Sequence, residues 1–569
     1  MKNKIPILSL CAFAFLNPRF SNAQHAENPV DKAKPEQLEK LGDHYIPNAY
    51  GNKKTSPPYT STSATLRNTN VFTMQVNVDS NGQNIIGDAA NEPNIAVNPQ
   101  NEDEIVIGWR QFDNVISNFR QAGWSYTSDG GQTWTFPGVI EPGVFRSDPV
   151  LDFDSSGNFY YNSLTLDNFG NFLCKVFKSD DGGSSWDNGT SAYGGDKQWM
   201  TIDRSAGTGS GNIYAFWTYA YSDCAPGFFT RSTDDGDSYE SCTQIGGYPF
   251  WGTLAVGING ELYIAGNDGF GNMEVVKSLN VQYADSSVTW QAPVQVDMDG
   301  FFDGSGINEE GLQGQANIDV DRSNGAGSGN VYVLASMTRT SNPDPADIMF
   351  SKSTDGGATW SAPVRVNDDN SQSNTQWFGT MSVAPNGRID AIWLDTRDSP
   401  GYDSSALYYS YSLDQGDTWS ANEKISDSFN PHVGYPNQNK MGDYFDMVSD
   451  DYSANLAWAN TLNGEEDVYY SRITPGVAVT VNGDPLSTFS ITPNPSAGKI
   501  IVSVPSVNGI NQGKPMSAEI FNQLGEKLFT QPLVKSKSEL DISSQPSGIY
   551  LVKIIDAAGN SVVKKMVKD

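Results

Sequence analysis

The octet "SDDGGSSW" at residues 179–186 indicates the fold, because close copies of it recur along the chain. "TSDGGQTW", "STDGGATW" and "SLDQGDTW" are three of these copies. The aromatic residues that close the successive copies are Trp134, Trp186, Tyr239, Trp290, Trp360 and Trp419. They follow one another at intervals of 52, 53, 51, 70 and 59 residues. A repeat of this length with about four short apolar strands per unit predicts a β-propeller.

Seven such units can be counted between about residues 91 and 473. The seventh has three strands and lacks a fourth, whereas the early segment "FTMQVNVDSNG" resembles the fourth strands of other units. We therefore predict that residues 72–79 complete the last sheet and close the ring, which removes two open sheet edges. The expected fold is all-β: a seven-bladed propeller, with six blades as the alternative, followed by a small C-terminal β-sandwich.

The composition agrees with an exported all-β protein. The 569 residues include 25 Tyr, 27 Phe, 13 Trp, 55 Gly and 30 Pro, and helical periodicity is nearly absent beyond the N-terminus. The net charge of −30 argues against nucleic acid or an anionic membrane as partner, since phosphates would be repelled. Two early lysines, an apolar run and small residues identify residues 1–23 as a signal peptide, and the polar residues 24–68 as a linker. No other segment is expected to span a membrane.

Three cysteines remain after removal of the signal peptide. Cys224 and Cys242 flank one of the repeated turns and are expected to form a disulfide, which export permits. Cys174 would then be left buried and unpaired. Only three histidines occur in the chain, so a histidine-based zinc site is not expected.

The repeated octets predict stapled turns. Each aspartate can accept hydrogen bonds from the backbone of its own turn, the glycines supply positive φ, and the final aromatic ring packs on neighbouring strands. Five good copies at one position per blade favour a structural role over calcium binding, although calcium stays an option. The aspartates are Asp129, Asp181, Asp234, Asp355 and Asp414.

These octets match the pattern "S-x-D-x-G-x-T-W" of the Asp-box, or bacterial neuraminidase repeat, and residues 69–475 resemble sialidase-like propellers. The resemblance implies the fold and allows several activities, because Asp-boxes also occur in lyases, other glycosidases and propellers without known activity. The chain departs from sialidases in lacking an early "R-I-P" motif and an assured Tyr/Glu pair.

The C-terminus resembles a second family. "ITPNPSAGKIIVSV", "LDISSQPSGIYLVKI" and the basic end "VVKKMVK" look like the type IX secretion sorting domain of Bacteroidetes, over residues 486–569 after a linker at 476–485. The resemblance implies transport through the periplasm and outer membrane by the type IX machinery. The protein would then be released or held at the cell surface.

Candidate site residues lie where the chain crosses between blades or turns between second and third strands, because these segments share the propeller mouth opposite the Asp-boxes. Three arginines there could bind an acidic sugar, and aromatic rings could stack on it. The substrate-binding candidates are Arg110, Arg146, Arg397, Trp199 and Trp377. The catalytic candidates are Asp148, Glu309, Asp443 and Tyr444, with Tyr435 as another option. The alternative is that the arginines form ion pairs and the tryptophans pack between blades.

Two functions follow from these candidates. The first is binding and cleavage of extracellular, preferentially acidic, glycans by a sialidase-like glycoside hydrolase or a polysaccharide lyase with no required cofactor. The second is a non-catalytic surface or adhesion propeller that binds a protein or polysaccharide.

Overall fold

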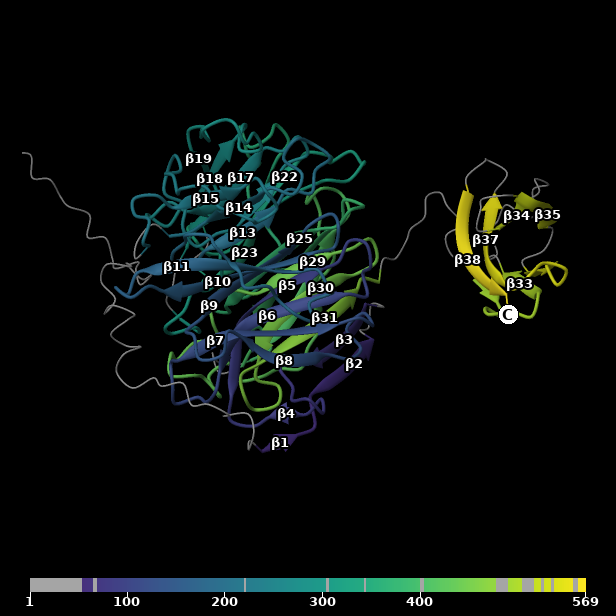
Figure 1. The fold of residues 1–569 in the computed structure, drawn as a ribbon, viewed down its shortest axis with the longest axis horizontal. Helices are drawn as coiled ribbons and strands as arrows, with labels where there is room; N and C mark the ends of the chain where they lie inside the picture. The colour runs from purple at the N-terminus through teal and green to yellow at the C-terminus, as the bar shows by residue number, and fades with distance from the viewer. Residues whose placement is uncertain are drawn as a thin grey trace, which may run out of the picture. The chain divides into compact units, whose positions relative to one another are not determined.

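The computed structural model describes residues 54–64, 69–218, 222–302, 306–341, 344–399, 404–476, 490–503, 516–522, 527–533, 537–555 and 561–568. They belong to two compact units, one within residues 1–476 and one within residues 477–569 (Figure 1). The predicted signal peptide at 1–23, most of the predicted linker at 24–68 and nearly all of that at 476–485 lie outside the described residues. The described residues contain strands and no helix. None of them therefore forms a helix able to cross a membrane.

Seven antiparallel sheets, here called blades 1 to 7, make up the ring of the first unit. Blade 1 contains β5 (Ala89–Val97), β6 (Ile105–Phe112), β7 (Arg120–Thr127) and β8 (Thr135–Ile140). Blade 2 contains β9 (Ser147–Phe153), β10 (Phe159–Leu166), β11 (Phe172–Ser179) and β12 (Thr190–Ser191). Blade 3 contains β13 (Trp199–Ile202), β14 (Ile213–Phe216) and β15 (Phe229–Ser232).

Blades 4 to 7 continue the same order. Blade 4 contains β16 (Leu254–Val256), β17 (Leu262–Asn267), β18 (Met273–Ser278) and β19 (Val294–Val296). Blade 5 contains β21 (Asn317–Val320), β22 (Val331–Arg339), β23 (Asp347–Ser353) and β24 (Val364–Arg365), with β20 (Gly300–Phe301) added to β22. Blade 6 contains β25 (Gln376–Val383), β26 (Ile389–Asp395), β27 (Ala406–Ser412) and β28 (Glu423–Lys424). Blade 7 contains β29 (Asp446–Ser449), β30 (Ala454–Asn460) and β31 (Asp467–Thr474).

The ring is closed by the N-terminal part of the unit. β3 (Asn70–Gln75) pairs antiparallel with β31, from Asn70 opposite Thr474 to Gln75 opposite Tyr469. The predicted closure is thus confirmed, by a strand that begins two residues and ends four residues earlier than expected. β2 (Thr60–Ala64) adds a fifth strand outside β3, which the sequence had not indicated, and β1 (Thr55–Ser56) pairs with β4 (Asn84–Ile85). The innermost strands follow one another as β5, β9, β13, β16, β21, β25 and β29, and β29 lies against β5.

Inner strands expose backbone N–H groups along the channel, and side chains of the preceding blade accept hydrogen bonds from them. Described bonds of this kind occur at six of the seven blade junctions: Leu151 N to Asn94 (2.7 Å), Ile202 N to Asp152 (2.7 Å), Ile318 N to Thr253 (2.9 Å), Val383 N to Asp319 (2.8 Å), Ser449 N to Ser382 (3.0 Å) and Ile95 N to Asp446 (3.2 Å). These bonds satisfy edge groups that the sheets leave open and tie each blade to the next.

Asp446 makes the junction between blades 7 and 1 sensitive to pH. Burial raises the pKa of this carboxyl to about 8. Between the usual aspartate pKa and pH 8, the folded protein keeps a proton that the unfolded chain has lost, so rising pH destabilises the fold. Asp446→Asn keeps an acceptor oxygen for Ile95 and cannot ionise. We therefore compare the free energy of unfolding of the variant with that of the parent. We expect the variant's value minus the parent's to increase by about 1 kcal/mol per pH unit from pH 5 to 8. Chemical denaturation at several pH values measures this, and a pH-independent difference would contradict it.

The Asp-box turns are uniform. In each, the aspartate accepts a backbone N–H and a hydroxyl from the residue four positions later, and a hydroxyl from the residue two positions earlier. In the turn of Asp129, for example, the N–H and hydroxyl of Thr133 lie 2.9 and 2.7 Å from the carboxylate. Both carboxylate oxygens are thus engaged within the turn, as expected for a structural staple.

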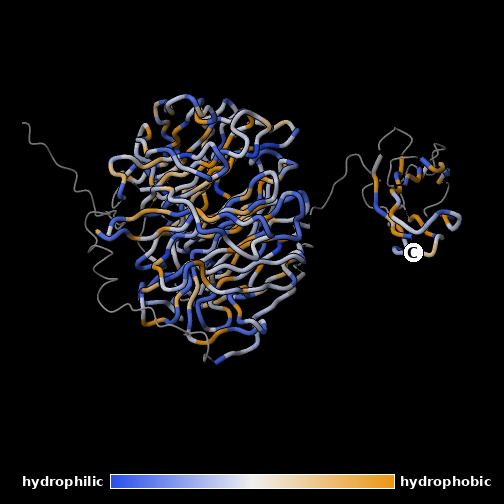
Figure 2. Tube along the Cα trace, viewed as in Figure 1, coloured by the Kyte–Doolittle hydropathy of each residue, from blue (hydrophilic) through white to orange (hydrophobic). Residues whose placement is uncertain are grey.

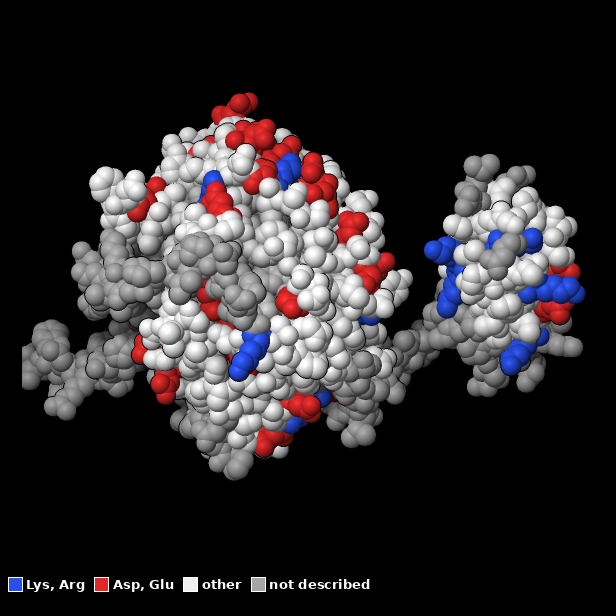
Figure 3. Space-filling view, turned by 60° about the horizontal axis from the view of Figure 1, so that its bottom comes forward, with Lys and Arg blue, Asp and Glu red and all other residues white. Residues whose placement is uncertain are grey.

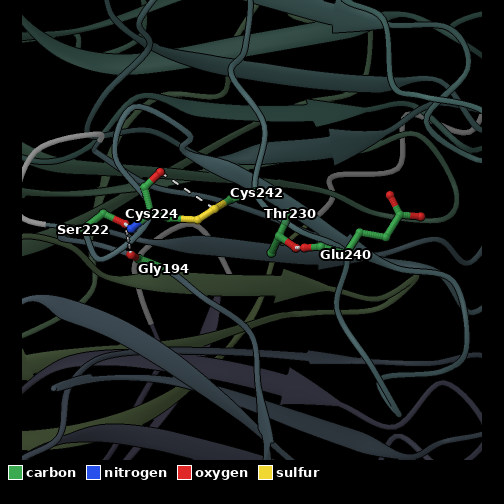
Figure 4. The surroundings of a disulfide bond; sticks show 6 residues. All are labelled: Gly194, Ser222, Cys224, Thr230, Glu240 and Cys242. Atoms are coloured by element: carbon green, nitrogen blue, oxygen red, sulfur yellow. Dashed lines mark hydrogen bonds between the residues drawn. A yellow bond between two sulfur atoms is a disulfide. The ribbon is translucent and has the colours of Figure 1, made fainter.

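Hydrophobic residues run along the strands of this unit, whereas many of its loops are hydrophilic (Figure 2). Cys224 and Cys242 form a disulfide in blade 3, with Cα atoms 6.3 Å apart, and Cys174 is buried and free. Beside the disulfide, the Ser222 hydroxyl donates to the carbonyl of Gly194 and accepts the N–H of Cys224 (Figure 4).

The second unit consists of two antiparallel sheets. One contains β32 (Ser490–Thr492), β33 (Lys499–Ser503) and β36 (Lys537–Asp541). The other contains β35 (Lys527–Leu533), β34 (Met516–Asn522), β37 (Gly548–Ile555) and β38 (Ser561–Lys568). Both contribute to one core that includes Ile500, Val502, Ile520 and Val552, so the unit is a small β-sandwich, as predicted.

Candidate functional site

Strand order defines two faces of the propeller. The crossing face receives the connections between blades and the turns between second and third strands. The Asp-box face receives the other turns. At the crossing face, five residues of positive φ that are not glycine lie within the first four residues of an inner strand or just before it: Glu92 (48°), Asp148 (46°), Lys197 (54°), Trp251 (54°) and Phe378 (55°). Strand pairing shifts register here, between Asn91 and Asn94 for example. Such bulges re-aim side chains, and strained backbone of this kind is typical of functional sites.

Six charged residues gather behind these bulges in what we call the mouth cluster: Glu92, Arg110, Asp148, Lys197, Lys440 and Asp443. Each is at most 7% exposed. The carboxylate of Asp443 lies 2.6 Å from the ammonium groups of both Lys197 and Lys440. Arg110 Nε lies 3.1 Å from Glu92 and donates to Asn91 at 2.8 Å. Blades 1, 2 and 7 and the crossings beside them thus share one buried ionic network.

The network separates the pKa values of its carboxyl groups. Burial raises the pKa of Glu92 to about 7, against the attraction of Arg110 and Lys197. For Asp443, burial is outweighed by Lys197 and Lys440, which hold its pKa well below the usual value. For Asp148, Lys197 and Arg110 likewise overcome burial and lower the pKa to about 2.

Two loops cover the mouth cluster. The Asn308 side chain donates to the carbonyl of Gly442 at 2.8 Å and accepts the N–H of Met441 at 3.1 Å. The N–H of Leu312 donates to Asp443 at 2.9 Å. The loop before blade 5 and the crossing before blade 7 are therefore joined over the cluster, which is closed to a large ligand in this conformation.

The three arginines of the sequence hypothesis have separate partners. Arg110 belongs to the mouth cluster. Arg146 pairs with Glu141, donates to the carbonyl of Ser163 and lies over the ring of Phe177. Arg397 pairs with a carboxylate set of its own, namely Asp395 (2.8 Å), Asp368 (2.7 Å) and Asp369 (3.7 Å). The described contacts thus follow the ion-pair alternative, since each of the three arginines lies against a carboxylate.

The aromatic candidates are packed inside the protein. Trp377 is fully buried and donates to Ser405 at 3.1 Å, and Trp199 packs edge-to-face on Tyr444 at 5.1 Å. The Tyr444 hydroxyl donates to the carbonyl of Pro149 at 2.9 Å, and burial raises its pKa well above the usual value. A buried phenol with a raised pKa is a poor nucleophile. The inter-blade packing alternative therefore describes these rings better than sugar stacking.

One candidate, Glu309, is exposed beside an open hollow on the crossing face, which we call the Tyr435 cavity. Its volume is about 590 Å³, and it is lined by Gly306, Ile307, Glu309, Asn430, His432, Tyr435 and Asn439. The Tyr435 hydroxyl lies 3.3 Å from Nδ1 of His432. Burial, with Glu466 and Glu309 adding to it, raises the pKa of Tyr435, so this phenol stays neutral.

A second hollow of about 390 Å³ opens from the channel at the Asp-box face. Inner strands of all seven blades line it, together with Arg204 and Arg322, which pair with Asp152 and Asp319. Among the described residues no group of three His, Cys, Asp or Glu side chains could hold a metal ion.

Some of this site could be foreseen and some could not. Positions for Arg110, Asp148, Glu309 and Asp443 at the mouth followed from aligning the repeats. Lys440, Asn308 and His432 were missed, although Lys440 stands three residues before Asp443 in "NKMGDYFD" and this spacing was a usable signal.

Residues 490–569 match the family model of the secretion system C-terminal sorting domain. No curated protein sequence matches the chain. Similar solved structures include a protein of unknown function from Dyadobacter fermentans (15% identity, 71% of this chain and 97% of that chain, TM-score 0.41) and a Trypanosoma rangeli sialidase (10%, 90% and 89%, 0.37). A third is PorZ, a surface component of the type-IX secretion system of Porphyromonas gingivalis (12%, 84% and 70%, 0.30).

The fold and the tail together define a class: an exported seven-bladed β-propeller with a C-terminal sorting domain. The sorting domain directs the protein through type IX secretion to the cell surface or the extracellular space.

Proposed function

We propose that this protein binds extracellular glycans through the Tyr435 cavity. The observation that carries the proposal is the mixture of groups around this hollow: one half-buried aromatic ring, an imidazole, an exposed carboxylate and the side-chain amides of Asn430 and Asn439. A polyhydroxylated ligand needs both donors and acceptors at close range and an apolar surface for its C–H groups. The chain's export to the outside of the cell supports an extracellular ligand.

The charges favour neutral or amino sugars over acidic ones. Glu309 brings a negative charge to the rim, and no arginine is among the described residues that line the cavity. The arginines expected to bind an acidic group are paired elsewhere with Glu92, Glu141 and Asp395. We therefore replace the acidic glycan of the sequence hypothesis with a neutral or basic one.

Titration calorimetry with neutral, amino and sialylated oligosaccharides tests the proposal. We expect Tyr435→Ala and Glu309→Gln each to weaken binding about tenfold or more, because each removes a polar or stacking contact. Glu310→Gln is the matched control: it is the adjacent exposed carboxylate and does not line the cavity. Absence of binding to every sugar, or equal loss in the Glu310 variant, would overturn the proposal.

Cleavage of the bound glycan is a second candidate, favoured by one observation. Glu92, with a pKa near 7, lies in the same network as the ionised Asp148 and Asp443, and such separated pKa values are typical of acid–base pairs. Catalysis would require the loops over the cluster to open. Release of reducing ends that Glu92→Gln abolishes, while sugar binding persists, would support it. Absence of turnover with the full oligosaccharide panel would remove it.

A further inference from the structure

Two turns on the crossing face are built alike and present a phenylalanine at the tip. They are "DNFGN" at 167–171 in blade 2 and "DGFGN" at 268–272 in blade 4. In both, the aspartate accepts the backbone N–H of the phenylalanine and that of the asparagine, and the asparagine amide donates back to the aspartate. The glycine has φ of 85° in the first turn and 95° in the second. Phe169 is 86% exposed and Phe270 is 89% exposed.

The turn itself does not require phenylalanine. The turn at 154–158, "DSSGN", lies on the Asp-box face of blade 2 and has the same three hydrogen bonds from Asp154, with Gly157 at φ 88°. Ser156 occupies the position of the phenylalanine there. The two exposed rings therefore serve something outside the turn.

Blade 1 carries a third apolar tip on the same face. Ile116 is 83% exposed, and its N–H donates to the side chain of Asn114 in a related turn. Ile116, Phe169 and Phe270 have the highest exposure of the large hydrophobic side chains in the part of the chain that the structure describes. All three lie in turns between second and third strands, so topology places them on one face.

We propose that these three tips insert into the interfacial region of a zwitterionic phospholipid bilayer. Single apolar side chains on separate rigid turns fit a fluid apolar phase, which adapts to any spacing, better than a protein partner, which would need a matching pocket for each. The sorting domain directs the protein to the cell surface or the extracellular space, where it can meet a membrane. The inference does not depend on the glycan cavity.

The negative charge of the protein favours zwitterionic over anionic lipids. Acidic side chains predominate on the visible face of the propeller unit in Figure 3, and the net charge of −30 repels anionic lipids. Asp167 and Asp268 stand two residues before the inserted rings, where they complement the ammonium group of an ethanolamine or choline head group. Three tips give reversible binding, comparable with that of one short acyl chain.

Flotation of the full chain with vesicles of phosphatidylethanolamine and phosphatidylcholine tests the proposal. We expect the parent to float, and Phe169→Ser with Phe270→Ser to lower the bound fraction about tenfold or more. Serine is chosen because Ser156 shows that this turn accepts it. The control is Tyr452→Ser, which removes a ring that is 76% exposed in a turn on the Asp-box face, and it should float as the parent does.

Three results would overturn the proposal: no flotation of the parent, flotation unchanged in the double variant, or flotation lost in the Tyr452 variant. If the parent does not float but binds a polysaccharide, and the double variant does not bind it, then the three apolar side chains contact a glycan and not a membrane. Thermal unfolding of each variant verifies that the fold is intact.

Discussion

Replacement of Asp443 by asparagine is expected to lower the free energy of unfolding by about 3–5 kcal/mol. Asparagine keeps the size of the side chain and an acceptor for the N–H of Leu312, but it removes the only charge that lies 2.6 Å from both Lys197 and Lys440 among the described contacts. The ammonium groups of Lys197 and Lys440 would then stay buried with less negative charge beside them. Urea denaturation of the variant and the parent measures the difference.

The matched control is Asp417→Asn. Asp417 also lies 2.6 Å from a lysine, Lys352, but its side chain is 68% exposed. Water screens such a pair, so the variant should lose less than about 1 kcal/mol. Equal losses at the two positions would mean that the mouth cluster contributes no more than a surface ion pair, contrary to our account.

Removal of the closing strand is expected to have the second large effect. A chain that begins at Val78 lacks β3, so β31 becomes an open edge, and it loses the buried side chains of Val71 and Val76. The N–H of Val76 also donates to the carbonyl of Val468, so blade 7 loses backbone bonds beyond the strand itself. We expect the shortened protein to aggregate or to melt at least 10 °C lower, roughly the shift that loss of several kcal/mol gives.

A chain that begins at Lys54 is the matched control, because it keeps β1, β2 and β3 while removing the preceding residues. Calorimetry and light scattering of both chains give the comparison. If both chains melt together as soluble monomers, the closure by β3 is not needed for the ring.

The repeat made the fold predictable. Turns such as "SDDGGSSW" recur at nearly constant spacing, and each blade needs the same local chemistry, so one recognised unit fixes its neighbours. The closing strand could be found because residues near Phe72 resemble fourth strands elsewhere. β2 could not be predicted, because this edge strand forms only by pairing with β3 and does not belong to the sequence repeat.

The candidate site was harder to predict for a physical reason. Repeat alignment places Arg110, Arg146 and Arg397 on one face, but the partner of a long charged side chain depends on which acid lies within a few ångströms after packing. Acidic residues outnumber basic ones, 66 to 36, and each of these three arginines pairs with an acid. Glu141, the partner of Arg146, lies in a connection whose conformation the repeat does not determine.

The burial of the mouth cluster also escaped sequence reasoning. Asn308 and Met441 are 133 residues apart, and only the folded ring brings their loops together over Asp443. These loops close over the mouth cluster, whereas the Tyr435 cavity on the same face stays open. The sequence predicted Glu309 as a site residue there, but it did not indicate His432.

The most direct test of the central claim is an experimental structure of the protein with a bound oligosaccharide. We expect sugar density in the Tyr435 cavity, with one ring against Tyr435 and a hydroxyl within hydrogen-bond distance of Glu309. Sugar bound instead in the channel of the Asp-box face, with the Tyr435 cavity empty, would contradict it.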